Sequence, residues 1–208
     1  MIETALGPRG RAVAAAEALA FEPIRGTTGP LSRIAAVLAM AGDSDHAFDV
    51  VELVLNQRER QIALFQVVSG LARSISPESA VDHMTHVDAP EQKALIRSLV
   101  AAALARKGEK ERAQSQLKEA ARSAGSAEGD RERAGAYAAV AYAMCALGMN
   151  EQTIGAWRTQ MASARPVGRT EVLTAVEVGA DLLAAAHYTG ELTAIGQAVV
   201  EVDSWWSR

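Results

Sequence analysis

The sequence has little of several residue types on which other folds and sites depend. A single cysteine, Cys145, among 208 residues excludes an internal disulfide framework and a multi-cysteine zinc or iron–sulfur site. Aromatic residues make up only 4%, so the 49% of hydrophobic residues are mostly aliphatic, and many are alanine. Strands favour branched and aromatic side chains, whereas alanine is the best helix former. The composition therefore favours an all-α fold of closely packed helices.

An excess of basic charge is also absent. The chain carries 21 Lys and Arg against 25 Asp and Glu, a net charge of −4. Nucleic-acid-binding domains normally show a basic stripe, so we expect no nucleic-acid partner. The first residues include Glu3 and no basic leader before an apolar run, which argues against a secretory signal. The uncharged run 134–150 is short for a membrane span, and we expect a cytoplasmic protein with no membrane partner.

The strongest positive signal is an internal repeat. Five tight turns are predicted, with spacings of 33, 33, 40 and 42 residues. Their centres are Gly42, Ile75, Gly108, Gly148 and Gly190. Apolar residues lie eight, seven and four positions before each turn, and five, nine and twelve positions after most of them. Both spacings follow one face of a helix, so each unit is predicted to be a helix, a tight turn and a second helix.

These positions predict the core. Before the turns, the triplets are Ile34/Ala35/Leu38, Val67/Val68/Leu71, Val100/Ala101/Leu104, Val140/Ala141/Met144 and Leu182/Leu183/Ala186. After the turns, they are Ala47/Val51/Val54, Ala80/Met84/Val87, Ala113/Leu117/Ala120, Thr153/Trp157/Gln160 and Ile195/Val199/Val202. Two residues of the fourth set after the turn are polar, and a shifted set of Ile154, Trp157 and Met161 fits the pattern better.

The repeats fill a single predicted domain of residues 1–208. Their expected ranges are 31–56, 61–88, 90–122, 131–164 and 170–203. Residues 1–20 look like half a unit, because Ala12, Ala16 and Leu19 follow Gly7 at five, nine and twelve positions. This segment is either an N-terminal capping helix or the end of an earlier repeat, in which case the chain is a piece of a longer array. Trp205 and Trp206 are expected to cap the last repeat or to dock onto another chain.

The same residues carry a family resemblance. The run from Leu104 through Gly108 to Ala113, followed by Leu117 and Ala120, closely resembles a tetratricopeptide repeat, and the run 38–47 is similar. The resemblance covers residues 31–203, although most first-helix aromatics and the closing proline of the family are absent. It implies a right-handed α-α superhelix, a solenoid of about five helix-turn-helix repeats plus the N-terminal capping helix.

The resemblance also implies a partner-binding groove, because first helices line the concave surface of such arrays. The residues expected there are Met40, Phe65, Arg73, Arg106, Tyr142, His187 and Tyr188. The lysine and asparagine set with which family members hold a terminal carboxylate is absent. An apolar or helical partner fits better, with Arg73 and Arg106 facing a carboxylate. In the alternative interpretation, the small residues of this face pack together and close the groove.

Candidate chemical sites are few. His83 and His86, three residues apart on a predicted helix, could place two metal ligands on one face, but a polar outer surface is the simpler interpretation. Cys145 lies in an apolar helix, and His187 is the nearest base in the next repeat, although a buried inert thiol is expected. We therefore expect no catalytic residues, no metal and no cofactor.

The sequence predicts a non-catalytic scaffold that binds a protein or peptide, as the sensor or adaptor part of a larger regulatory protein. Two other functions stay open. One is a self-assembling structural module that forms a homo-oligomer through its incomplete ends. The other is an enzyme or metal-dependent site that uses His83 and His86, or Cys145 and His187.

Overall fold

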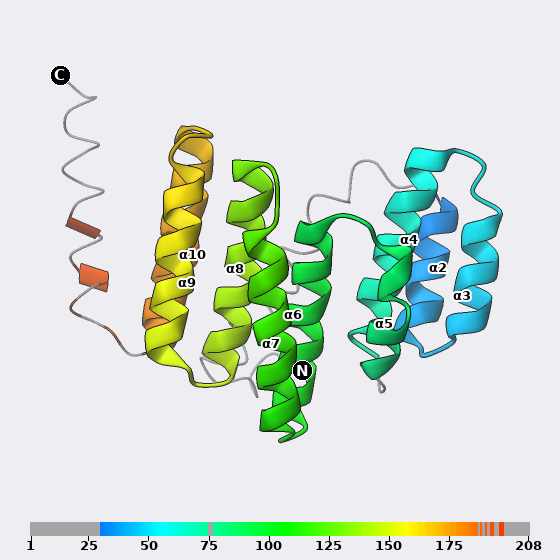
Figure 1. Ribbon diagram of the computed structural model, residues 1–208, viewed down its shortest axis with the longest axis horizontal. Helices are drawn as coiled ribbons and strands as arrows, with labels where there is room; N and C mark the ends of the chain where they lie inside the picture. Colours follow the sequence, from blue (N-terminus) through cyan, green and yellow to red (C-terminus); the bar gives the residue numbers. More distant parts are fainter. Residues whose placement is uncertain are drawn as a thin grey trace, which may run out of the picture.

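The computed structural model describes residues 30–74 and 77–186, together with positions 188, 190, 192–193 and 196–197. All regular secondary structure in these residues is helical, which confirms the all-α prediction for this part of the chain (Figure 1). The helices are α2 (Pro30–Met40), α3 (Ser44–Glu52), α4 (Gln57–Leu71), α5 (Glu78–Asp82), the 3₁₀ helix η2 (Met84–His86), α6 (Pro90–Arg106), α7 (Lys110–Gly125), α8 (Asp130–Ala146), α9 (Asn150–Ala164) and α10 (Arg169–Ala185). The predicted cap 1–20, Trp205 and Trp206 lie outside the described residues. None of the described helices has both the length and the apolar character that crossing a bilayer requires.

The helices form pairs that stand side by side in a row from α2 to α10 (Figure 1). Helix α2 pairs with α3, α6 with α7 and α8 with α9, while α4 pairs with the short α5 and η2. First helices of neighbouring pairs contact each other, and each second helix also contacts the first helix of the next pair. Each pair therefore buries apolar surface against its neighbours, which is the packing that makes stacked pairs stable.

Three of the predicted turns share one hydrogen-bonded geometry. Gly42, Gly108 and Gly148 have φ angles of 86°, 82° and 74°, in the left-handed region that glycine enters at the least cost. The amide of each glycine donates to the carbonyl three residues earlier, and the next amide donates to the carbonyl five residues earlier. This is the Schellman motif, which satisfies carbonyls left over at a helix end. The carbonyls that accept the second bond mark equivalent positions in the pairs, and they belong to Leu38, Leu104 and Met144.

The predicted fifth turn at Gly190 is wrong. Helix α10 ends at Ala185, and the Tyr188 amide donates to the Leu183 carbonyl at 2.9 Å, as in the second bond of the other turns. Leu183 is therefore the counterpart of Met144, at a spacing of 39 residues rather than 42. Residues 180–188 contain no glycine, so the glycine pattern placed the predicted turn at the next glycine, Gly190.

Longer second helices account for the wider spacing of the later pairs. Helices α7 and α9 contain 16 and 15 residues, against 9 in α3 and 5 in α5. Helix α7 continues to Gly125, and α8 begins at Asp130, so the extra residues extend a helix and leave the connection short. The packing of each pair can therefore repeat although the sequence period does not.

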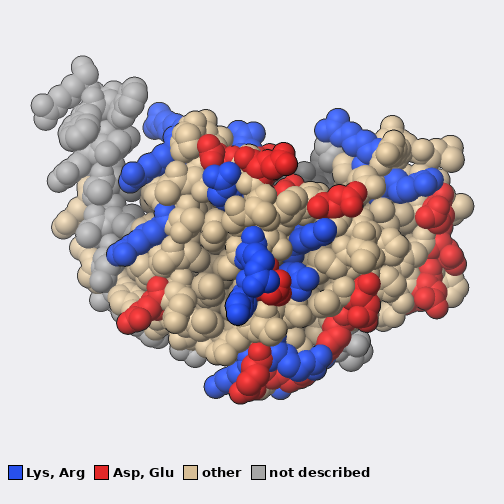
Figure 2. Space-filling view, in the orientation of Figure 1, with Lys and Arg blue, Asp and Glu red and all other residues tan. Residues whose placement is uncertain are grey.

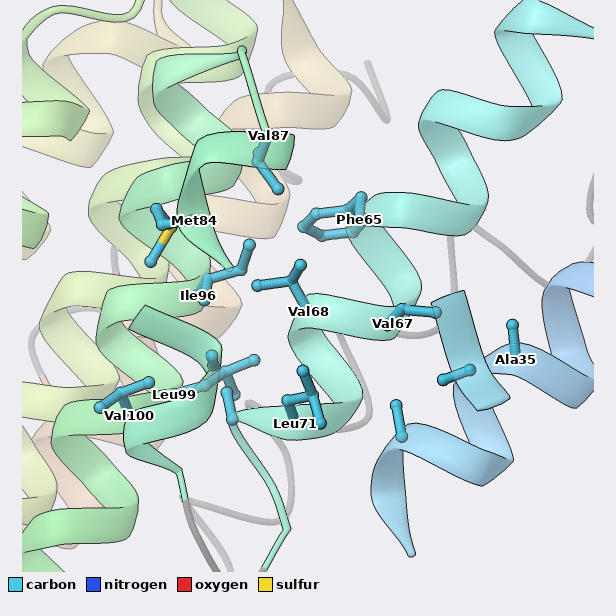
Figure 3. Close-up of a cluster of buried hydrophobic side chains, with 14 of the residues drawn as sticks. Ala35, Phe65, Val67, Val68, Leu71, Met84, Val87, Ile96, Leu99 and Val100 are labelled. Atoms are coloured by element: carbon cyan, nitrogen blue, oxygen red, sulfur yellow. The ribbon is translucent and has the colours of Figure 1, made fainter. Parts of the chain in front are cut away.

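An apolar cluster joins α4 to α6 across the least extensive contact between neighbouring first helices. Figure 3 shows Phe65 and Val68 of α4 directed toward Ile96 of α6, with Leu71 and Leu99 below them. Val68 and Ile96 are fully buried, and Leu71 is 1% exposed. The cluster therefore connects the α2–α5 part of the row to the α6–α10 part through side chains.

Most first-helix triplet residues are buried as predicted, but Leu38, Met144 and Ala186 are half-buried and one residue is exposed. Ile34 is 50% exposed, although it was predicted as a core residue. Its counterparts lie four residues before Leu71, Leu104 and Met144, as Ile34 lies four residues before Leu38. These counterparts are fully buried, and they are Val67, Val100 and Val140. The difference is explained by position, because α2 is the first helix of the described row.

The shifted core set predicted for α9 is also wrong. Thr153 is fully buried and Gln160 is 3% exposed, whereas Ile154 and Met161 are half-buried. The Thr153 hydroxyl donates to the Met149 carbonyl at 2.9 Å, one turn earlier. This bond satisfies the hydroxyl inside the helix, which is why a polar residue can occupy the buried position.

Candidate functional site

The predicted groove residues separate into an accessible row and a buried interior. Met40, Arg73 and Arg106 each lie two residues after Leu38, Leu71 and Leu104 respectively. Met40 is 47% exposed, Arg106 is exposed and Arg73 is half-buried. These three residues therefore form a row of equivalent positions, the C-terminal row, near the C-terminal ends of α2, α4 and α6.

Phe65 and Tyr142 belong to the buried interior instead. Phe65 is 9% exposed and Tyr142 is 3% exposed, and both are part of the apolar core. The Tyr142 hydroxyl donates to Asp181 Oδ2 of α10 at 3.3 Å. Burial raises the pKa of Tyr142, and the nearby negative charge of Asp181 raises it further. Tyr142 therefore acts as a neutral core residue that connects α8 to α10.

The remaining predicted positions are at the end of the row. His187 lies outside the described residues, and Tyr188 is half-buried. The structure thus brings Met40, Arg73 and Arg106 to equivalent surface positions but does not place Phe65 or Tyr142 with them.

Small residues close the inner face between these positions. Ala36, Ala72 and Ala102 are at most 8% exposed, so the close-packed interpretation holds at these positions. Gln66 and Ser69 are also more than nine-tenths buried. In the described part of the chain, Gln66 Oε1 and Ser69 Oγ have no hydrogen-bond partner. The inner side of α4 is therefore polar as well as buried.

The inner face of α10 differs from that of α8. With Leu183 aligned to Met144, four α10 residues at inner-face positions are exposed, and they are Thr174, Glu177, Asp181 and Ala184. Ala185, the counterpart of Met40, Arg73 and Arg106, is buried. Asp181 was not predicted as an inner-face residue, because the predicted turn lay three residues too late. The hydrogen-bonded turn at Leu183 is the signal that corrects the alignment. The last described first helix thus presents two carboxylates, Glu177 and Asp181, one turn apart.

The two histidines proposed as metal ligands form a ring cluster. The rings of His83 and His86 both contact Phe48 of α3 in a tilted arrangement, with centroids 4.5 and 5.1 Å from the phenyl ring. The two imidazoles are 5.8 Å apart. Within residues 30–74 and 77–186, no group of three or more His, Cys, Asp or Glu residues is placed to hold a metal ion. The pair therefore packs α3 against the second unit.

Of the two residues of the predicted thiol site, Cys145 is buried and His187 lies outside the described residues. Cys145 is 3% exposed and lies in the apolar cluster of α8. Burial among apolar groups disfavours the thiolate, which is the nucleophilic form. The predicted base, His187, is not among the described residues.

The face of the row on which the second helices α7 and α9 lie carries charged residues of both signs. Figure 2 shows Lys, Arg, Asp and Glu scattered over this view, with wide areas of uncharged residues between them. On the second helix α7, Arg112 pairs with the N-cap residue Glu109, and Arg122 pairs with Glu119. Such exposed pairs contribute little to stability and do not form a field of one sign.

Comparison with protein-family models, with curated proteins and with solved structures found no match to this chain.

Proposed function

We propose that the chain is a non-catalytic scaffold of tetratricopeptide-like repeats, wound as a right-handed superhelix, that binds an extended peptide segment of a partner protein. The observation that carries this proposal is the C-terminal row of Met40, Arg73 and Arg106 at equivalent positions of successive first helices. A row of repeated positions suits a ligand that is itself periodic.

The spacing of the row supports an extended ligand. Packed helices lie about 8–10 Å apart, and an extended peptide advances about 3.3 Å per residue. Where first helices pack closely, as α2 and α4 do, every third residue of a peptide that crosses them would therefore meet one position of the row. The chemistry of the row favours an apolar residue at Met40 and carboxylates at Arg73 and Arg106.

The charges of the first helices give such a peptide a direction. Guanidinium groups lie on the α4 and α6 side, and the carboxylates of Glu177 and Asp181 lie on α10. A peptide with an acidic end and a basic end would bind in one orientation, because the reverse orientation places like charges together.

The test is selection of peptides from a displayed random library on the whole chain, followed by fluorescence polarisation with the selected peptides. We expect enriched peptides to contain two acidic residues, Asp or Glu, at least three positions apart. Arg106→Glu should weaken their binding at least about tenfold, because it replaces an attraction by a repulsion. Lys118→Glu is the matched control, since Lys118 is exposed on the second helix α7. Peptides that bind wild type and Arg106→Glu equally well would contradict the proposal.

A further inference from the structure

Helix α2 exposes apolar side chains at positions that every later first helix hides. Ile34 is 50% exposed and Val37 is 66% exposed. The counterparts of Ile34 are fully buried, and they are Val67, Val100 and Val140. The counterparts of Val37 are Gly70, Ala103 and Ala143, and they are buried too. The exposed positions therefore belong to the repeated packing surface, not to an ordinary helix exterior.

Two glycines show what these positions normally face. Gly179 of α10 is the counterpart of Ile34, and a Cβ added there would lie 2.5 Å from Nε1 of Trp157 on α9. Gly70 of α4 is the counterpart of Val37, and a Cβ added there would lie 3.0 Å from Cβ of Ala39 on α2. The first position thus faces the second helix of the preceding pair, and the second position faces its first helix. Ile34 therefore points to the place of a second helix that would precede α2.

Residues 10–20 have the sequence of such a second helix. Ala12, Ala16 and Leu19 follow Gly7 at the positions that are buried in the other second helices. Their counterparts in the units of α3 and α7 are at most 4% exposed, and they are Ala47, Val51, Val54, Ala113, Leu117 and Ala120. All of these except Val54, which follows the end of α3, lie inside the two helices. Alanine makes up most of the segment, and alanine has the highest helix propensity.

Side-chain sizes are complementary across this contact. Trp157 in the second helix faces a glycine, Gly179, in the next first helix. Leu117, the counterpart of Trp157 in α7, is followed in α8 by Val140 at the counterpart of Gly179, and both belong to one core cluster. Ala16 is the residue at this position in the segment 10–20, so the larger Ile34 would fill the space that its small side chain leaves.

We propose that residues 10–20 form a helix that docks on Ile34 and Val37 of α2, in the place that the second helix of a preceding pair takes. Ala16 then lies against Ile34. The proposal is independent of peptide binding, because it concerns the apolar face of α2 and not the C-terminal row. A helix that covers this face also prevents another copy of the chain from packing on it.

The direct test is a disulfide between introduced cysteines in a Cys145→Ala background. Ala16→Cys combined with Ile34→Cys should oxidise at low protein concentration to an intramolecular disulfide, identified by peptide mass mapping. The matched control is Ala14→Cys with Ile34→Cys, because residue 14 lies on the opposite side of the predicted helix. We expect the Ala16 pair to form at least about ten times faster. Equal rates for the two pairs, or a disulfide that links two chains, would overturn the proposal, and the second result would assign the surface to another copy.

A second test uses hydrogen exchange and needs no introduced cysteine. Leu19→Asp should lower hydrogen-exchange protection of the α2 amides at least about tenfold and leave α8 unchanged, because only α2 loses its cover. Ala14→Asp is the control and should leave α2 protected. If Leu19→Asp has no effect on α2 while light scattering shows a monomer, residues 10–20 do not cover this face and the proposal fails.

Discussion

At the residue scale, the contact between Gly179 and Trp157 leaves no room for a methyl group. The indole lies over Gly179, and its Nε1–H donates to the Ala175 carbonyl at 2.7 Å, which fixes the ring. Gly179→Ala must displace the ring or separate α9 from α10. We expect a loss of about 1–3 kcal/mol in the free energy of unfolding, measured by chemical denaturation followed by circular dichroism.

The matched control is another helical glycine. Gly155 lies inside α9 with nothing within 4 Å of an added Cβ, so Gly155→Ala should stabilise the chain by about 0.5–1 kcal/mol. The two substitutions are chemically identical and opposite in sign. A stabilising Gly179→Ala would show that α9 and α10 are not packed as closely as described.

A second residue-scale prediction concerns the start of α3. His46 Nδ1 and Asp43 Oδ1 are 2.9 Å apart, and Asp43 also accepts the His46 amide as the N-cap. The hydrogen bond with Asp43 raises the pKa of His46 above its ordinary 6.5, and the same contact lowers the pKa of Asp43 below 3.8. The pair therefore stabilises the fold between these values. Its contribution falls as the pH rises through the His46 pKa or drops through the Asp43 pKa.

An NMR titration of the His46 ring checks this directly. Asp43→Asn removes the charge but keeps an oxygen that can cap the helix. We expect the His46 pKa to move down toward 6.5 in this variant. An unchanged titration midpoint would mean that the ring does not sense the carboxylate.

At the element scale, two arginines hold the connection between one pair and the next in the same way. Arg60 and Arg133 are the fourth residues of α4 and α8. Each donates to the carbonyl six residues earlier, Arg60 Nε to Val54 at 2.9 Å and Arg133 Nη2 to Ala127 at 3.0 Å. Arg133 also donates to the Glu128 carbonyl at 3.3 Å. These bonds satisfy carbonyls that the preceding helix cannot.

Removing one such arginine should loosen the connection. Arg133→Met keeps the apolar stem and removes the donors, and we expect it to lower the free energy of unfolding by about 1–2 kcal/mol. Arg122→Met is the control, because the Arg122 side chain is 63% exposed and pairs with Glu119, which is 38% exposed, on the surface of α7. Its effect should stay below about 0.5 kcal/mol in the same denaturation experiment. Equal effects of the two substitutions would exclude a special role for Arg133.

Helix pairs could be predicted from the sequence because local chemistry determines them. Gly42, Gly108 and Gly148 end helices in a conformation that other residues avoid, and apolar spacing identifies the packed faces. The turn after α10 escaped prediction because its hydrogen bond joins the backbones of Tyr188 and Leu183 and carries no sequence signature. A turn can therefore be predicted from the sequence where a glycine forms it, and not where backbone hydrogen bonds form it without a glycine.

The candidate surface was less predictable than the helices. Met40 and Arg106 could be assigned to the surface from their position in the repeat, but Phe65 and Tyr142 could not be recognised as buried. Their burial depends on the distance between neighbouring helices, and small residues such as Ala102 let those helices approach. A sequence pattern gives the direction of a side chain but not the separation of the elements around it.

At the scale of the whole molecule, the row of pairs has a weak point between α4 and α6. Contact there is the least extensive between first helices, and Figure 2 shows the outline notched at its upper edge between the two parts. The apolar cluster of Figure 3 spans the junction, so the parts are coupled through few side chains. In stacked repeats, stability is approximately a sum of local and nearest-neighbour contributions. A weak junction therefore limits how far a local loss of stability spreads.

Matched leucine truncations on either side of the junction test this coupling. Leu71 is 1% exposed in α4, and Leu182 is fully buried in α10, so each change to alanine should cost about 2–5 kcal/mol. Because the junction is weak, Leu71→Ala should lower hydrogen-exchange protection in α2–α5 and leave α8–α10 protected, and Leu182→Ala should do the reverse. The intermediate helix α6 should respond to both, since it contacts α4 on one side and α8 on the other. Equal loss of protection across all helices in both variants would show that the pairs unfold as one cooperative unit, in which case the α4–α6 cluster would be strong enough to bind the two parts together.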